Sequence, residues 1–252
     1  MRSIHPGPTA RQEIGYLLAT LGLGPLLIAQ AVRVRRNIVR LEEPTGARSG
    51  CEGVGAPLRL LIAGDSAAAG VGAPTQEEAL SGQLVAALRP TCMVHWKLVA
   101  QTGQTVRDLI GQLRALASER FDVAIVSIGV NDTTSRTGSR KWIERQATLI
   151  ELLKVKFGVA HILLSSLPPM QVFPALPQPL RWYLGMRAAQ LNSMLRAIAQ
   201  GEASCEFLPI DFPFEPEYVA ADGFHPAAPA YSAWAAAAAR AIRHRTGAQA
   251  HG

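Results

Sequence analysis

Residues 122–128 read DVAIVSI and are followed directly by Gly129-Val130-Asn131-Asp132. A nearly continuous apolar run of this length, closed by a glycine, is typical of a strand buried on both faces of a parallel sheet. On either side of it along the chain, short apolar runs alternate with longer stretches whose apolar residues recur at helical spacing. This alternation predicts an α/β domain in which helices cover both faces of a parallel sheet.

The same reading predicts the other elements of this domain. The predicted strands are 58–63, 94–100, 122–128, 161–165 and 206–210, and the predicted helices are 77–88, 106–117, 141–157, 180–199 and 229–243. Residues 168–183 contain several prolines and are predicted to form a long irregular loop, suited to wall or cover a pocket.

An apolar and basic segment precedes this domain. Residues 14–32 carry no charge and are about long enough to span a bilayer core. Four arginines follow at once, at positions 33, 35, 36 and 40. Residues 14–40 therefore favour a hydrophobic helix associated with a membrane surface, and the positive-inside rule would leave the following domain in the cytoplasm.

Two alternatives to a membrane anchor stay open at this point. Ala29-Gln30-Ala31 fits the small-x-small cleavage pattern of a signal peptide, which would make the mature protein periplasmic or secreted. A helix packed against the domain or lying in the interface would read the same way. The predicted segments are thus 1–41 (hydrophobic and basic), 42–57 (a flexible linker), 58–246 (the folded domain) and 247–252 (a tail).

Charge and cysteine usage exclude some function classes. The net charge is +6, of which +4 lies in residues 1–50, and no basic run is interleaved with aromatic residues. We therefore expect no nucleic-acid partner. The three cysteines, Cys51, Cys92 and Cys205, form no CxxC pair and read as free thiols, and no cluster of Cys and His suggests a metal.

Polar residues follow three of the predicted strands. They are Gly64-Asp65-Ser66, Gln101-Thr102-Gly103 and Gly129-Val130-Asn131-Asp132. The carboxyl ends of parallel strands meet at one edge of a sheet, where ligands of open α/β sheets bind. We therefore expect these three sets to converge on one site.

Ser66 and His225 are the candidate nucleophile and general base. Small neighbours, Gly64 and the alanines at 67–69, would let a substrate carbonyl approach Ser66 closely. His225 lies in the loop Asp222-Gly223-Phe224-His225-Pro226, where Asp222 can accept a hydrogen bond from the imidazole and fix its tautomer. Taken alone, Ser66 is better interpreted as a helix N-cap, and Asp-x-x-His alone often means only a loop hydrogen bond.

Donors for an oxyanion can also be named. The backbone N–H groups of Ser66 and Gly103 and the side-chain amide of Asn131 are suitable. For Asn131 alone, an Asx-turn after a strand is a fair alternative.

Taken together, these four blocks resemble the SGNH hydrolases, also called the GDSL esterase/lipase family, over about residues 58–245. The resemblance implies a flavodoxin-like three-layer α/β/α sandwich with a five-stranded parallel sheet. It also implies a Ser66–His225–Asp222 triad, an oxyanion hole of Ser66, Gly103 and Asn131, and cleavage of carboxylic esters through an acyl-serine intermediate without metal or cofactor. Position 67 is Ala rather than the Leu of the family's short name.

The substrate is less defined than the chemistry. Apolar residues of the 168–183 segment, including Met170, Phe173 and Trp182, favour an apolar acyl or aryl site, and Asp65 beside the nucleophile is a further candidate contact. We expect a small-molecule or lipid ester as substrate.

Other functions fit the sequence to different degrees. An acyltransferase or a deacetylase acting on a sugar or lipid would use the same triad, so the sequence leaves it open. A nucleotide-binding module is disfavoured because GDSAAAGVG (64–72) lacks both the P-loop ending and the GxGxxG spacing. An α/β-hydrolase is disfavoured because GxSxG is absent, and an inactive binding scaffold because all four blocks are present.

Overall fold

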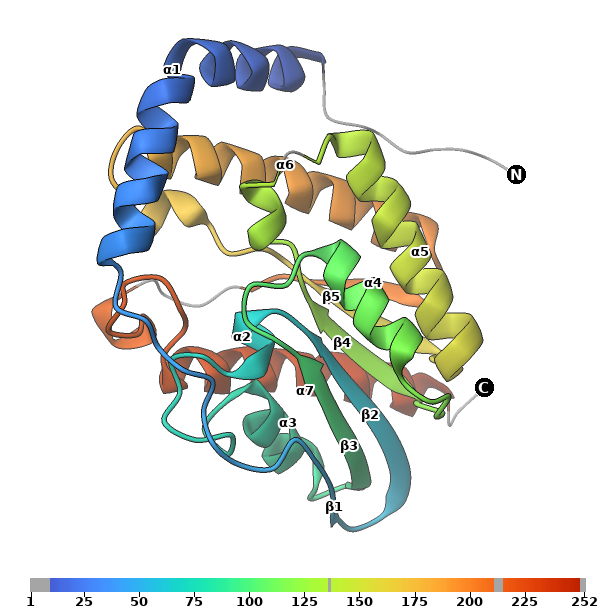
Figure 1. Ribbon diagram of the computed structural model, residues 1–252. Coiled ribbons are helices and arrows are strands. Elements are labelled where there is room, and N and C mark those ends of the chain that lie inside the picture. The colour runs from blue at the N-terminus through green and yellow to red at the C-terminus, as the bar shows by residue number, and fades with distance from the viewer. Residues whose placement is uncertain (1–9, 136, 211–214, 250–252) are drawn as a thin grey trace.

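The computed structural model describes residues 10–135, 137–210 and 215–249. A single six-stranded sheet runs through the middle of the molecule, with helices packed on both of its faces (Figure 1). The strands are β1 Ser49–Gly53, β2 Ala56–Gly64, β3 Cys92–Ala100, β4 Val123–Ser127, β5 His161–Ser165 and β6 Cys205–Leu208. The helices are α1 Ala10–Asn37, α2 Ser66–Ala69, α3 Leu80–Leu88, α4 Val106–Ala115, α5 Ser139–Phe157, α6 Leu180–Gly201 and α7 Ala228–Gln249. Short 3₁₀ turns lie at Asn131–Thr133, Met170–Val172 and Pro216–Tyr218.

The order of the strands in the sheet is β1-β3-β2-β4-β5-β6. Strands β2 to β6 are mutually parallel, and counted from β2 along the chain they lie in the order 2-1-3-4-5. This is the order of the flavodoxin-like doubly wound sheet. The fold class expected from the sequence is therefore confirmed.

The sheet has one strand more than predicted. β1 pairs antiparallel with β3, with Ser49 opposite Lys97 and Gly53 opposite Met93. Its sequence, SGCEG, has no apolar alternation because it is an exposed edge strand, so nothing in the hydrophobic pattern could reveal it. Part of the segment predicted as a linker (42–57) is therefore strand, and the folded domain begins before residue 58. At the other end, α7 continues to Gln249, into the predicted tail.

Two apolar layers flank the sheet. α4, α5 and α6 cover one face, where Trp142 and Phe157 are the largest fully buried side chains. α3 and α7 cover the other face, where Tyr231 and Trp234 are buried. Alternate residues of β2 point into opposite layers, Leu61 toward α4–α6 and Leu60 toward α3 and α7. Burial on both faces explains why the central strands read as continuous apolar runs.

Helix α1 packs against α6 and is visibly bent in Figure 1. It contains Pro25, which lacks an N–H and disrupts the regular helical hydrogen bonding. Leu27 is buried in the α4–α6 layer, and Gln30 accepts from the N–H of Leu180 at 3.0 Å and donates to the carbonyl of Gln178 at 2.7 Å.

Much of the apolar surface of α1 is nevertheless exposed, including Leu18, Leu21 and Ile28. Within the described part of the chain, no helix combines the length and the apolar character needed to cross a membrane.

Candidate active site

Ser66 lies at the start of the short helix α2, directly after β2. Gly64 is needed for this turn, because a Cβ at that position would lie 1.9 Å from the carbonyl oxygen of Ser127. Asp65 is the N-cap of α2, and its Oδ1 accepts from the N–H of Ala67 at 3.2 Å. The cap is therefore Asp65 and not Ser66, so the hydroxyl of Ser66 is available for another partner.

That partner is His225. Its Nε2 lies 2.9 Å from Oγ of Ser66, and its Nδ1 lies 2.5 Å from Oδ2 of Asp222. Asp222 is buried, and its other oxygen, Oδ1, accepts from the backbone N–H groups of Phe224 and His225, each at 3.0 Å. Serine, histidine and aspartate thus form one continuous chain of hydrogen bonds.

The Asp222 carboxylate is held in its ionised form. Burial raises its pKa, but the hydrogen bonds from the His225 ring and backbone outweigh burial, so the net pKa is lowered. An ionised Asp222 accepts the Nδ1 proton of His225, which leaves Nε2 as the basic nitrogen facing Ser66.

The loop that carries His225 is fixed by backbone bonds. Val219 and Pro226 form an antiparallel bridge, and Ala220 donates to the His225 carbonyl at 2.8 Å. The ring of Phe224 packs edge-on against Phe173, with ring centroids 4.9 Å apart. The 168–183 segment therefore supports the histidine loop.

Asn131 contacts the loop that carries Gly103, and neither residue lines the pocket beside Ser66 and His225. Gly103 is exposed in the loop after β3, and the Nδ2 of Asn131 donates to the carbonyl of the next residue, Gln104, at 2.9 Å. Gln101 donates to the carbonyl of Gly64 at 3.3 Å, which joins this loop to the end of β2 beside Ser66. Among the described residues, neither the Ser66 N–H nor the Gly103 N–H has a hydrogen-bond acceptor.

A pocket opens beside Ser66 and His225. It is a narrow cleft with a cavity volume of about 50 Å³. Among the described residues that line it, the ionisable side chains are those of Asp65, Tyr218 and His225, and most of the wall is apolar. The apolar wall consists of Ile128, Val130, Leu167, Pro168, Phe173, Ile210, Val219, Phe224, Pro226 and Trp234.

The four substrate-contact candidates separate in the structure. Phe173 and Asp65 line this pocket, although Asp65 is only 2% exposed and serves the α2 cap. Met170 and Trp182 do not line it. Met170 is buried in the α4–α6 layer, and Trp182, 46% exposed, lies on the outside of α6. Position in the proline-rich segment 168–183 could not show that Phe173, and not Met170 or Trp182, faces the pocket.

Several pocket residues escaped the sequence analysis. Ser127, Ser165 and Trp234 line the pocket from β4, β5 and α7. Ser127 and Ser165 are the last residues of two buried strands, and a polar residue ending a buried strand is a usable sign of a site at that sheet edge. Trp234 lies within an alanine-rich helix and carries no such sign.

Comparison with known proteins agrees with this geometry. The model of the GDSL-like lipase/acylhydrolase family matches residues 62–233. The chain belongs to the GDSL-like lipase/acylhydrolase family. It is 28% identical over 238 residues to a GDSL-like esterase of Mycobacterium tuberculosis, covering 85% of this chain and 74% of that protein. Family membership makes the chain an ester hydrolase of the SGNH type, as its motifs predict.

Solved structures share the fold. A lipase of Streptomyces rimosus matches with a TM-score of 0.55 at 16% identity, over 73% of this chain and 99% of that one. A phospholipase A1 of Streptomyces albidoflavus matches with a TM-score of 0.55 at 18% identity, over 74% and 99%. A family 2 carbohydrate esterase of Corynascus matches with a TM-score of 0.58 at 18% identity, over 81% and 69%.

Proposed function

We propose that this ester hydrolase uses Ser66 as nucleophile, His225 as general base and acid, and Asp222 to orient and charge-balance His225. The observation that carries this proposal is the continuous chain Ser66 Oγ–His225 Nε2 (2.9 Å) and His225 Nδ1–Asp222 Oδ2 (2.5 Å). These contacts match the roles of a serine triad in both distance and order.

The reaction follows from this arrangement. Nε2 of His225 takes the hydroxyl proton as Oγ of Ser66 attacks the ester carbonyl, and the tetrahedral intermediate collapses when the C–O bond to the alcohol breaks. The leaving oxygen takes the proton from His225. A water molecule then gives a proton to Nε2 and attacks the acyl-serine, and Ser66 recovers its proton as the acid departs.

The oxyanion of each tetrahedral intermediate needs fixed donors. The N–H groups of Ser66 and Gly103 have no acceptor among the described residues, and the Asn131 amide retains a second N–H beyond the one given to Gln104. We assign these three groups to the oxyanion hole. Loss of one such donor costs about 10²- to 10³-fold in kcat.

The acyl group is proposed to be apolar and uncharged. The pocket wall is mostly apolar, and burying a charged acyl chain there without a partner would be costly. Nitrophenyl esters of increasing chain length test this: we expect hydrolysis of apolar esters, abolished by Ser66→Ala. Turnover of only charged or sugar esters would contradict the proposed pocket. Transfer of the acyl group to a sugar or lipid alcohol is the second candidate, and added acceptor alcohols would reveal it as new ester.

A membrane surface is the proposed setting of the substrate. α1 exposes Leu18, Leu21 and Ile28, and carries Arg33, Arg35 and Arg36 near its end. A groove between the end of α1 and the loop 174–177 includes Asp222 in its lining, so the helix lies beside the catalytic loop. An apolar face next to a basic cluster suits an anionic lipid interface.

A further inference from the structure

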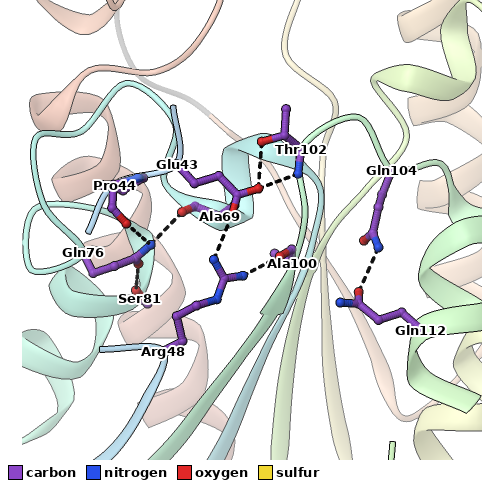
Figure 2. Close-up of polar contacts among 10 residues, drawn as sticks. All are labelled: Glu43, Pro44, Arg48, Ala69, Gln76, Ser81, Ala100, Thr102, Gln104 and Gln112. Carbon is purple, nitrogen blue, oxygen red and sulfur yellow. Dashed lines mark hydrogen bonds and ion pairs between the residues drawn. The ribbon is translucent and has the colours of Figure 1, made fainter. Parts of the chain in front are cut away.

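The loop that carries Gly103 is held by a residue outside the family's motifs. Glu43 lies in the segment 38–48 between α1 and β1, and its Oε1 accepts from both the N–H and the hydroxyl of Thr102, at 2.7 and 2.8 Å. Figure 2 shows this carboxylate facing Thr102 from one side and Arg48 from the other. Thr102 directly precedes Gly103, so the contact acts on the peptide unit next to the proposed oxyanion donor.

Arg48 completes the contact from the sheet side. Its Nη1 donates to Oε2 of Glu43 at 2.9 Å, and its Nη2 donates to the carbonyl of Ala100, the last residue of β3. Partial burial raises the pKa of Glu43, but the bonds from Thr102 and Arg48 outweigh it, so the pKa is lowered and the acceptor stays ionised. Charge-assisted bonds of this kind are shorter and stronger than neutral ones.

The same segment also reaches the helix that carries Ser66. The carbonyl of Pro44 accepts from Nε2 of Gln76 at 3.3 Å, and the same Nε2 donates to the carbonyl of Ala69, the end of α2, at 2.8 Å. Gln76 is 2% exposed, and its Oε1 accepts from Ser81 at 2.8 Å (Figure 2). Residues 43–48 therefore bind the Thr102–Gly103 loop directly and are linked to α2 through Gln76.

We propose that Glu43, held by Arg48, is a positioning residue for the oxyanion hole, fixing the Thr102–Gly103 peptide relative to Ser66. This inference rests on the proposed function. An oxyanion hole accelerates the reaction only when its donors are pre-organised, since a donor that must be reoriented during the reaction loses much of its benefit. A displacement of about 1 Å in a catalytic group can cost on the order of 10²-fold in rate.

The test compares Glu43→Ala with Glu43→Gln in nitrophenyl ester hydrolysis by the full chain. We expect Glu43→Ala to lower kcat by about 10- to 100-fold with KM changed less than about 3-fold. Glu43→Gln keeps an oxygen facing Thr102 and should recover kcat to within about 5-fold of wild type. Thr102→Val removes the hydroxyl bond but leaves the backbone bond to Glu43 in place, so it should lower kcat by a smaller factor than Glu43→Ala. It tests the same contact if Glu43→Ala fails to fold.

One further measurement distinguishes a role of Glu43 in positioning the oxyanion hole from a purely structural role. An arylboronic acid forms a tetrahedral adduct whose oxygen occupies the oxyanion hole, so its inhibition constant should rise in parallel with the fall in kcat/KM across the variants. Glu52→Ala is the matched control: Glu52 pairs with Arg89 on exposed surface of β1, and its loss should change neither constant by more than about 2-fold.

The outcomes separate this inference from the proposed function. A wild-type protein without esterase activity would contradict the proposed function. An active wild type with full kcat and unchanged boronate inhibition in Glu43→Ala would overturn only the role of Glu43. A lower kcat with unchanged boronate inhibition would also overturn it, because the loss would then arise outside the oxyanion hole.

Discussion

The carboxyl group of Asp65 caps α2 and is at the same time buried. Its Oδ1 caps the helix, while its Oδ2 is buried without a hydrogen-bond partner among the described residues. Burial raises its pKa to about 7, against the lowering effects of the Ala67 N–H and of His225, and Asp132 adds to the rise. Ionisation of this residue, which lies beside the proposed nucleophile, therefore costs stability.

The pH dependence of folding follows from this raised pKa. Between the pKa of about 3.8 in the unfolded chain and about 7 in the folded protein, the native state binds the extra proton. This contribution to the free energy of unfolding is therefore present below pH 4, declines as pH rises, and is lost above pH 7.

Asp65→Asn removes this titration but keeps a side-chain oxygen for the cap. We expect its melting temperature, relative to wild type, to increase between pH 5 and pH 8. Thermal unfolding at several pH values measures the difference. A constant difference over that range would contradict the assignment of a raised pKa to Asp65.

At the scale of elements, the loop that bears His225 packs on the turn after α2. Gly72 has φ +100°, and a Cβ there would lie 2.2 Å from the carbonyl oxygen of Pro226, next to His225. Gly72→Ala should therefore shift the His225 loop, lower kcat by at least about 10-fold and destabilise the fold by more than about 1 kcal/mol.

Gly111 is the matched control for this change. It lies exposed in the middle of α4, and a Cβ there meets nothing within 4 Å. Gly111→Ala should stabilise the protein by about 0.5–1 kcal/mol and leave kcat unchanged. Equal activity in the two variants, measured with urea unfolding as the stability reference, would show that the turn does not position His225.

The extent to which sequence predicts these elements differs with their burial. The five parallel strands were predicted because burial on both faces gives continuous apolar runs, as in β4. β1 was missed because an edge strand of small and polar residues is defined by backbone pairing to β3 alone. The start of α3 at Leu80 rather than 77 reflects a turn at Thr75–Glu78 that helical periodicity does not register.

The same distinction applies to the candidate site. The proximity of Ser66, His225 and Asp222 could be predicted, because strand ends converge and Asp222 is three residues from His225. The contact between Glu43 and Thr102 could not, since it joins positions 59 apart in the chain through a segment that reads as a linker. The apolar wall was only partly predicted: Phe173 faces the pocket, and Met170 and Trp182 do not.

For the whole molecule, the distribution of charge and apolar surface suggests how it meets its substrate. The exposed apolar residues of α1 and the arginines that follow them lie at one end of the chain. This helix packs on α6, and its end shares a groove with Asp222. We expect the protein to sediment with vesicles containing anionic lipids and not with neutral ones.

Replacing Arg33, Arg35, Arg36 and Arg40 with glutamine should weaken this binding, by about 1 kcal/mol for each arginine near the surface. The hydrolysis of a soluble short-chain ester should be unchanged in the same variant. Binding to neutral vesicles as strong as to anionic ones would contradict the electrostatic part of this account.

Labelling with a fluorophosphonate probe, followed by peptide mapping, tests whether Ser66 is the nucleophile. The probe phosphonylates an activated serine with loss of fluoride. We expect label on the peptide containing Ser66 in wild type, none in Ser66→Ala, and wild-type labelling in Ser165→Ala, which alters another serine of the same pocket. Label on a different peptide, or label that survives Ser66→Ala, would contradict the assignment of Ser66 as the nucleophile.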